Sequence, residues 1–245
     1  DLLPNTIQNY KRLGTIIADA RNAGLIDWDA IEDRTRNLRH ASHWESPKDI
    51  LEACAQQFRY DLWRSQPFRV EVWIEKDALS GVFEPVCNRL DVPLFACRGY
   101  TSKSELRAAG RRMLHQAKES QTSVVLHFGD HDPSGLDMTR DVQKWLSVYA
   151  ERHIIVQRLA LNWDQIGRHN PPPNPAKSTD SRFKAYAAEY GRNSWELDAL
   201  EPAVLASLVE TAVDDYRNKS LWDDAVEAEQ IARQRLRLLA NEWEG

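Results

Sequence analysis

The chain has 245 residues, of which 42% are hydrophobic and 28% are charged, and its formal net charge is −5. This composition is typical of a soluble globular protein with one large or two modest domains. No apolar run approaches the roughly 18 residues of a membrane span, and no signal-peptide pattern is present. Three cysteines without a CxxC pair indicate reduced, buried thiols in a cytoplasmic protein. The net charge does not by itself indicate a nucleic-acid binder.

The N-terminal segment, residues 1–66, combines an amphipathic pattern with basic residues. A helix is predicted over residues 5–24, ending at Gly24, a residue type suited to a helix C-terminus. A Gly-Leu-Ile sequence, a short predicted helix and the basic residues Arg34 and Arg36 follow. This order resembles part of a winged helix, in which the two arginines would contact DNA phosphates. A solvated basic surface is the alternative interpretation.

Strand and helix signals alternate over residues 67–160. Strands are predicted for the apolar runs at 70–75, 93–97, 123–128 and 154–156. Helices, with apolar residues at helical spacing, are predicted at 77–90, 102–119 and 136–150. This alternation predicts an α/β fold in which a parallel sheet is flanked by helices.

Three carboxylates follow the ends of predicted strands. Glu75 ends the first strand, and Asp130 and Asp132 follow the third. Ligands of such sheets bind beyond the carboxyl ends of the strands. Side chains two residues apart in extended chain point the same way, so we expect Asp130 and Asp132 to project together.

Carboxylates brought together in this way would repel one another. Two unit charges ~4 Å apart cost about 4 kcal/mol at an effective dielectric constant near 20. A raised pKa, a basic neighbour such as Lys76 or a divalent cation would offset that cost. Because Mg²⁺ prefers oxygen ligands, the sequence predicts a Mg²⁺ site, with Mn²⁺ as a second candidate ion. An Asp-x-Asp pair alone also occurs by chance in polar loops. Its combination with Glu75 and Lys76 favours the metal site.

The motifs around these carboxylates match a known pattern. They read Glu75-Lys76-Asp77-Ala78, Gly99-Tyr100-Thr101 and Asp130-His131-Asp132-Pro133-Ser134-Gly135. In order and spacing they resemble Toprim domains, and more closely the A subunit of topoisomerase VI and its meiotic recombination relatives. Thr101 stands where that family has proline. The resemblance implies a Toprim-type parallel sheet and Mg²⁺ ligation by Glu75, Asp130 and Asp132. In this reading Glu75 doubles as general acid or base, and Lys76 stabilises the phosphate.

The same resemblance implies Mg²⁺-dependent DNA cleavage or strand transfer by a homodimer. In that family a winged helix before the Toprim unit carries a nucleophilic tyrosine. The chain opens at Asp1 without an initiator Met, and we expect the tyrosine-bearing helix to lie upstream. Tyr10 has no matching motif, so we expect it to pack in a helix. The sequence contains no P-loop, so any ATP would be used by a separate ATPase subunit. The rival readings are a simple Toprim nuclease without a covalent intermediate and a non-catalytic DNA-binding protein.

Basic residues recur along the predicted helix at 102–119. Lys103, Arg107 and Arg111 are spaced four residues apart and share one side of the helix. A solvated helix face is the alternative to phosphate contact. Because this group directly follows the loop at Gly99, we favour contact with DNA phosphates.

The last region, residues 161–245, is predicted to complete the Toprim part of the chain. A stiff Pro-rich loop at 170–177 leads into residues 178–182, and helices are predicted after Arg182 to about Glu189 and at 202–218 and 221–243. Glu196 and Asp198 lie in a Glu-Leu-Asp-Ala-Leu stretch that resembles one found late in the topoisomerase VI A family. We favour solvated helix-cap carboxylates over added acidity near the metal. The tryptophans are scattered over many elements, which indicates core packing rather than base stacking; they include Trp63, Trp73, Trp145, Trp163 and Trp195.

Overall fold

The computed structural model describes residues 6–31, 41 and 43–243, and the chain divides into two compact units, 1–49 and 50–245. The first unit contains the helix α1 (Ile7–Asn22) and the short 3-10 helix η1 (Trp28–Ala30). The hydroxyl of Thr6 caps α1 by accepting the N–H of Asn9 at 3.2 Å. The helix predicted over 5–24 is therefore confirmed.

Two predictions concern side chains of the N-terminal segment. Tyr10 lies in α1, where it is 79% exposed, and no residue of α1 is buried. The first unit by itself therefore offers no core for α1, and the expected packing of Tyr10 stays a prediction. Arg34 and Arg36 lie outside the described residues. The winged-helix resemblance stays an expectation.

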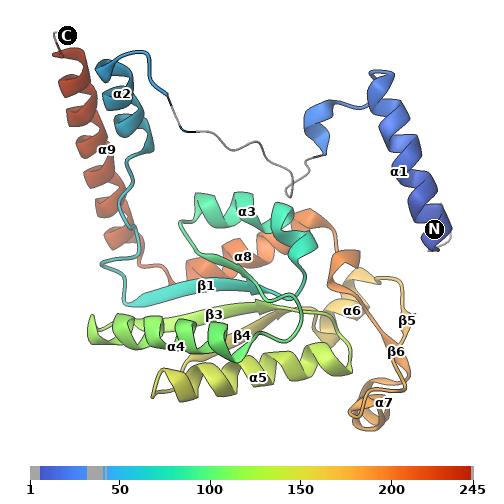
Figure 1. The fold of residues 1–245 in the computed structure, drawn as a ribbon. Coiled ribbons are helices and arrows are strands. Elements are labelled where there is room, and N and C mark those ends of the chain that lie inside the picture. The colour runs from blue at the N-terminus through green and yellow to red at the C-terminus, as the bar shows by residue number, and fades with distance from the viewer. Residues whose placement is uncertain (1–5, 32–40, 42, 244–245) are drawn as a thin grey trace. The chain divides into compact units, whose positions relative to one another are not determined.

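The second unit is built around a four-stranded sheet. Its strands are β1 (Phe68–Ile74), β2 (Leu94–Ala96), β3 (Thr122–Phe128) and β4 (Ile155–Ala160). Their order is β2-β1-β3-β4, and all pairs are parallel (Figure 1). β1 and β3 pair from Phe68 opposite Thr122 to Ile74 opposite Phe128. The predicted α/β class with a parallel sheet is confirmed.

Helices cover both faces of this sheet (Figure 1). They are α3 (Ser80–Arg89) and α8 (Pro202–Tyr216) on one face, and α4 (Lys103–Lys118) and α5 (Pro133–Tyr149) on the other. Val72 belongs to the same buried cluster as Phe83 of α3, whereas Trp73 belongs to the cluster of Leu106 in α4. Successive residues of a strand point to opposite faces, which explains the division. No helix within the described residues is long and apolar enough to cross a membrane.

Helix α5 begins three residues earlier than predicted. Oδ1 of Asp132 accepts the N–H of Gly135 at 2.5 Å, and Pro133 occupies the first turn. An Asp cap followed by Pro is a favourable helix start, because the carboxylate satisfies an unpaired N–H and proline lacks one. The proposed metal motif is therefore also the N-terminus of a helix.

The C-terminal region consists of short elements around two longer helices. Besides α8, these are α6 (Trp163–His169), β5 (Asn174–Pro175), α7 (Phe183–Tyr190), β6 (Asn193–Ser194), the 3-10 helix η3 (Leu197–Ala199) and α9 (Lys219–Asn241). Part of the predicted Pro-rich loop pairs as β5 with β6. α7 starts at Phe183, directly after Arg182 as predicted. Before it, the Asp180 carboxylate accepts the N–H of Arg182 at 2.8 Å in a turn. Figure 1 shows α6, β5, β6 and α7 grouped beyond one end of the sheet.

The remaining elements are α2 (Pro47–Gln57) and the 3-10 helix η2 (Asp77–Leu79). Burial agrees with expectation at some side chains and differs at others. Cys87 is buried as predicted, whereas Cys97 is half-buried and Cys54 is exposed. Trp63 and Trp73 are each 1% exposed, whereas Trp163 is 49% exposed. The prediction of core packing is therefore wrong for Trp163.

Candidate functional site

The structure brings Glu75 and Asp130 together at the carboxyl ends of β1 and β3. Because these strands pair up to Ile74 and Phe128, the residues that follow them are neighbours. The N–H of Asp130 donates to Oε2 of Glu75 at 2.9 Å. A Cβ atom on Gly129 would lie 2.8 Å from that same oxygen, so glycine lets the carboxylate approach the loop.

Asp132 stands at the start of α5 beside this pair. Its carboxylate accepts the N–H of Gly135 and, at 2.9 Å, the hydroxyl of Ser134. Its negative charge helps to raise the pKa of both Glu75 and Asp130. A Cβ atom on Gly135 would collide with the carbonyl oxygen of Asp130, so only glycine allows the tight turn between the two aspartates.

The pKa of Glu75 is raised to about 7. Burial is the largest cause, followed by the charge of Asp130 and, further down, that of Asp132. The N–H of Asp130 and the charge of Arg158 act in the opposite direction. A carboxyl group with a pKa near neutrality exists in both protonation states at pH 7, which suits a general acid or base.

Lys76 lies at the centre of a group of three carboxylates. Its Nζ is 3.1 Å from Oδ2 of Asp130, 3.0 Å from Glu196 and 3.3 Å from Asp198. Burial lowers the pKa of Lys76, but these carboxylates outweigh it and raise the pKa above its ordinary value. Lys76 is therefore the basic residue that offsets the expected repulsion between the carboxylates. Glu196 and Asp198 were expected to be solvated caps; they are half-exposed, but they also bind this lysine.

Arg158 is a site residue that sequence reasoning missed. Its guanidinium donates to the carbonyl oxygens of Gly129 at 2.8 Å, Asp130 at 2.6 Å and Gly135 at 3.0 Å. It also donates to the hydroxyl of Thr139 at 2.7 Å. Burial lowers its pKa to about 10, against the charges of the nearby carboxylates, so it stays positive at pH 7. Arg158 thus holds the loop that carries the aspartates and offsets their charge.

A sequence signal for Arg158 did exist. The predicted strand at 154–156 ended before it, whereas β4 continues to Ala160. Arginine is rarely buried without partners, so an arginine inside an apolar strand indicates a polar network. The backbone carbonyls that form this network could not be identified from sequence.

The C-terminal segment fixes the acidic loop from the other side. The backbone N–H of His131 donates to the backbone carbonyl of Trp195 at 2.8 Å, and the backbone N–H of Trp195 donates to the carbonyl of His131 at 3.0 Å. The N–H of Leu197 donates to Oδ1 of Asp130 at 2.8 Å. Asp130 is therefore held by a segment more than sixty residues away in sequence.

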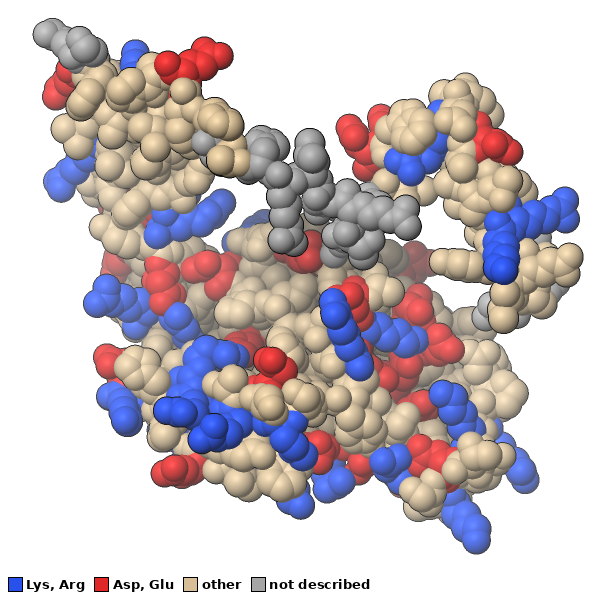
Figure 2. Space-filling view, viewed as in Figure 1, with Lys and Arg blue, Asp and Glu red and all other residues tan. Residues whose placement is uncertain are grey.

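The predicted DNA-contacting residues of α4 lie along a basic face, visible in Figure 2 as Lys and Arg gathered over this helix. Lys103, at its start, pairs with Asp141 at 3.4 Å. Arg107 and Arg111 border a hollow of about 420 Å³ beside Tyr149, at the last residue of α5. Asp132 caps the opposite end of this 17-residue helix, about 25 Å away at 1.5 Å per residue. Lys103 lies closer to Asp132 than Arg107 and Arg111 do, because its partner Asp141 is about halfway along α5.

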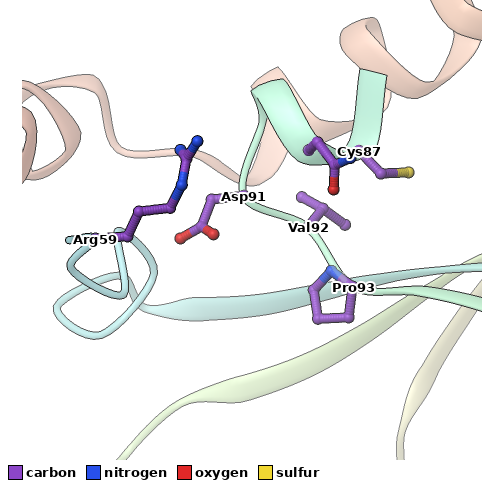
Figure 3. A pocket seen from close by; sticks show the side chains of 6 residues that line it. Arg59, Cys87, Asp91, Val92 and Pro93 are labelled. Carbon is purple, nitrogen blue, oxygen red and sulfur yellow. The ribbon is translucent and has the colours of Figure 1, made fainter. Parts of the chain in front are cut away.

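A second hollow, of about 530 Å³, lies at the amino end of β2, away from Glu75, Asp130 and Asp132. Figure 3 shows Arg59 and Asp91 on its wall, with Cys87 and Pro93. Burial raises the pKa of the Cys87 thiol to about 12, so the thiol is protonated and unreactive at pH 7. This hollow offers no group for chemistry comparable to that at Glu75.

The acidic side chains at this edge of the sheet meet the requirements of a metal ion only in part. The carboxylate oxygens of Glu75, Asp130 and Asp132 are ligands that Mg²⁺ prefers. Within the part of the chain that the structure describes, however, no three acidic, histidine or cysteine side chains are grouped closely enough to share an ion. The Lys76 ammonium occupies Oδ2 of Asp130 instead. The carboxylate oxygens are therefore suitable ligands for Mg²⁺. In this structure their negative charge is offset by Lys76 and Arg158.

No protein family, curated protein or solved structure matches the chain. Fold and site define an α/β protein with an acidic group at the carboxyl edge of a four-stranded parallel sheet.

Proposed function

We propose that the chain is a Toprim protein of the topoisomerase VI A type that cleaves DNA, or transfers its strands, with Mg²⁺. One observation carries this proposal. Glu75, with a pKa of about 7, accepts the N–H of Asp130 at the carboxyl edge of a parallel sheet, with Asp132 close by. That edge is where sheets of this kind bind ligands, and carboxylates there suit a hard cation and a phosphate.

The roles follow from the chemistry of each side chain. Glu75, Asp130 and Asp132 would hold the ion, which when bound would neutralise charge on the scissile phosphate. Glu75 would also move a proton to or from the reacting oxygen, because its pKa lies near the working pH. Lys76, whose ammonium pairs with Asp130, would stabilise the phosphate. Arg158 would keep the loop of the two aspartates in position.

The finer organisation belongs to the same proposal. Residues 1–66 would form a winged-helix-like DNA-binding segment, residues 67–160 the Toprim domain, and residues 161–245 its completion. The hydrogen bonds from Trp195 and Leu197 to the acidic loop support the last assignment. A homodimer in the cytoplasm, with a separate ATPase subunit as partner, would follow from the family resemblance.

One observation favours a second candidate, a non-catalytic DNA-binding protein. Lys76 and Arg158 already neutralise the carboxylates without a metal. In that case the acidic group is a structural ion-pair network. A nuclease without a covalent intermediate differs from the main proposal only in the attacking group, which would be water in place of a tyrosine.

Nicking of supercoiled plasmid DNA tests the proposal. The protein should nick in Mg²⁺ or Mn²⁺ and stop in EDTA. Asp130→Asn should remove this activity while its remaining carbonyl oxygen still accepts the N–H of Leu197. Asp223→Asn, which changes an exposed carboxylate on α9 that pairs with Lys219, is the matched control and should stay active.

The outcomes separate the three candidates. A protein–DNA adduct trapped by detergent indicates strand transfer, and nicking without an adduct indicates hydrolysis. DNA binding without any metal-dependent nicking overturns the enzymatic proposal in favour of the ion-pair network.

A further inference from the structure

Five aromatic side chains form a cluster beside the acidic loop, and we refer to them as the aromatic cluster. They are His131, Trp163, Tyr186, Tyr190 and Trp195, with ring centroids between 4.7 and 5.9 Å apart. They come from the acidic loop, the start of α6, helix α7 and the segment after β6. The cluster therefore joins the carboxylate site to the elements beyond the end of the sheet in Figure 1.

The inner members of the aromatic cluster are fixed. His131, Tyr186 and Trp195 are 1%, 5% and 8% exposed. The Tyr186 hydroxyl lies 2.9 Å from Nδ1 of His131 and donates to the carbonyl of Asn193 at 2.9 Å. The backbones of His131 and Trp195 pair in both directions. These contacts make a rigid base under the outer rings.

The outer members reach the surface. Trp163 is 49% exposed, and Tyr190 is half-buried. Their ring centroids are 5.3 Å apart, and Trp163 also packs edge-on against Trp195 at 5.5 Å. A half-exposed tryptophan contributes less to the core than a buried one, yet here three other rings hold it in a defined orientation. Rigid aromatic rings with a free face are what base stacking requires.

The position of the aromatic cluster relates it to the proposed chemistry. His131 lies between Asp130 and Asp132 in sequence, and its ring centroid is 4.7 Å from that of Tyr190. A nucleotide whose phosphate reaches the carboxylates would therefore have its own base, or a neighbouring one, near these rings. The faces of bases inside a duplex are covered by their neighbours, so only an unpaired base can stack on a protein ring.

We propose that Trp163 and Tyr190 form a stacking platform for an unpaired nucleobase, so that the site takes DNA with a single-stranded or opened segment. This inference rests on the proposed function and names the substrate class of that same site. Stacking is tolerant of sequence, because every base has a face to offer. It also supplies binding that does not depend on positive charge, which suits a chain with a net charge of −5.

A binding experiment without metal tests the platform separately from catalysis. Fluorescence anisotropy of the full chain in EDTA would compare a labelled oligothymidylate with an abasic strand of equal length. Both probes carry the same phosphates, but only the first carries bases. The wild-type protein should prefer the base-bearing strand by about 5- to 150-fold.

Variants assign that preference to the platform. Trp163→Ala and Tyr190→Ala should each lose most of the preference, and Trp163→Phe should keep much of it because a ring remains. Trp243→Ala is the matched control, since Trp243 is also 49% exposed but follows the end of α9. Thermal unfolding would establish that each variant is folded.

The results distinguish the platform from the proposed function. Equal loss of affinity for both strands in Trp163→Ala, or no loss, overturns the platform whether or not the wild-type protein nicks plasmid. A lost base preference supports the platform, even if no nicking is ever observed. A wild-type protein with no preference for the base-bearing strand also overturns it.

Discussion

The N–H of Asp130 donates a 2.9 Å hydrogen bond to Oε2 of Glu75, which links the loops after two neighbouring strands. The bond stabilises the ionised form of Glu75, but burial and the neighbouring aspartates prevail and raise its pKa to about 7. The protonation of Glu75 is therefore expected to change near neutral pH.

The pH dependence of stability should reveal this carboxyl group. Its folded-state pKa of about 7 lies above the ordinary 4.5, so its protonated form favours the folded state. That contribution is full below pH 4.5 and is lost as the pH rises through 7. In metal-free buffer, wild-type protein should lose about 2 kcal/mol of unfolding free energy over this range relative to Glu75→Gln. Urea unfolding at a series of pH values measures this difference, and parallel pH profiles would contradict the assignment.

Asp132 has two roles that can be separated by substitution. Asp132→Ala removes the proposed ligand and the cap of α5, so it should abolish Mg²⁺-dependent nicking and lower the unfolding free energy by about 1 kcal/mol. Asp132→Asn should also abolish nicking but keep most of the stability, because asparagine caps helices as well as aspartate does. Nicking assays and urea unfolding provide the two readouts. Activity surviving in either variant would remove Asp132 from the ligand set.

Lys76 should compete with a cation for the same carboxylates. Lys76→Met leaves Asp130, Glu196 and Asp198 without their shared partner, so the unfolding free energy should fall by about 1–3 kcal/mol in metal-free buffer. Mg²⁺ should then raise the melting temperature of this variant more than that of the wild-type protein.

The control for this prediction is Lys219→Met, which breaks an exposed pair with Asp223 and should change little. Calorimetry with and without Mg²⁺ gives the comparison. An identical Mg²⁺ response in Lys76→Met and wild-type protein would argue against a cation at Asp130.

Charge reversal on α4 tests the basic face. Arg107→Glu with Arg111→Glu should weaken DNA binding and reduce the slope of log affinity against log salt by about 2, because two phosphate contacts are lost. The control is the same reversal at Arg235 and Arg237, which are exposed on α9. Anisotropy titrations between low and moderate salt measure the slope. Unchanged binding would indicate that Arg107 and Arg111 lie on a solvated helix face without DNA contacts, which would agree with their distance from Asp132.

Assembly is the last prediction. Cutting both strands of a duplex needs two sites related by a two-fold axis, which is also the commonest symmetry of soluble oligomers. Light scattering at micromolar concentration should give the mass of a dimer, with one Glu75–Asp130–Asp132 site in each subunit. A monomer mass in the presence of DNA would favour a nuclease that nicks one strand at a time.

Local signals accounted for most of the fold. Apolar runs and helical spacing placed β1, β3 and the main helices to within a few residues, because these patterns depend on neighbours in sequence. The start of α5 differed, and its cause is a local interaction that competes with periodicity. Asp132 starts α5 early by capping it.

The sequence by itself determined the parallel sheet and the position of Glu75 and Asp130 at its strand ends. The carboxyl ends of parallel strands lie at one edge of a sheet, so residues that follow two such strands lie at the same edge. Only the tertiary structure decided what surrounds them. Glu196 reaches Lys76 across 120 residues, and Leu197 reaches Asp130 across 67. The packing of α7, α8 and the β5–β6 pair decides which loop covers this edge of the sheet. Such contacts between distant segments produce no periodic pattern of apolar residues from which they could be predicted.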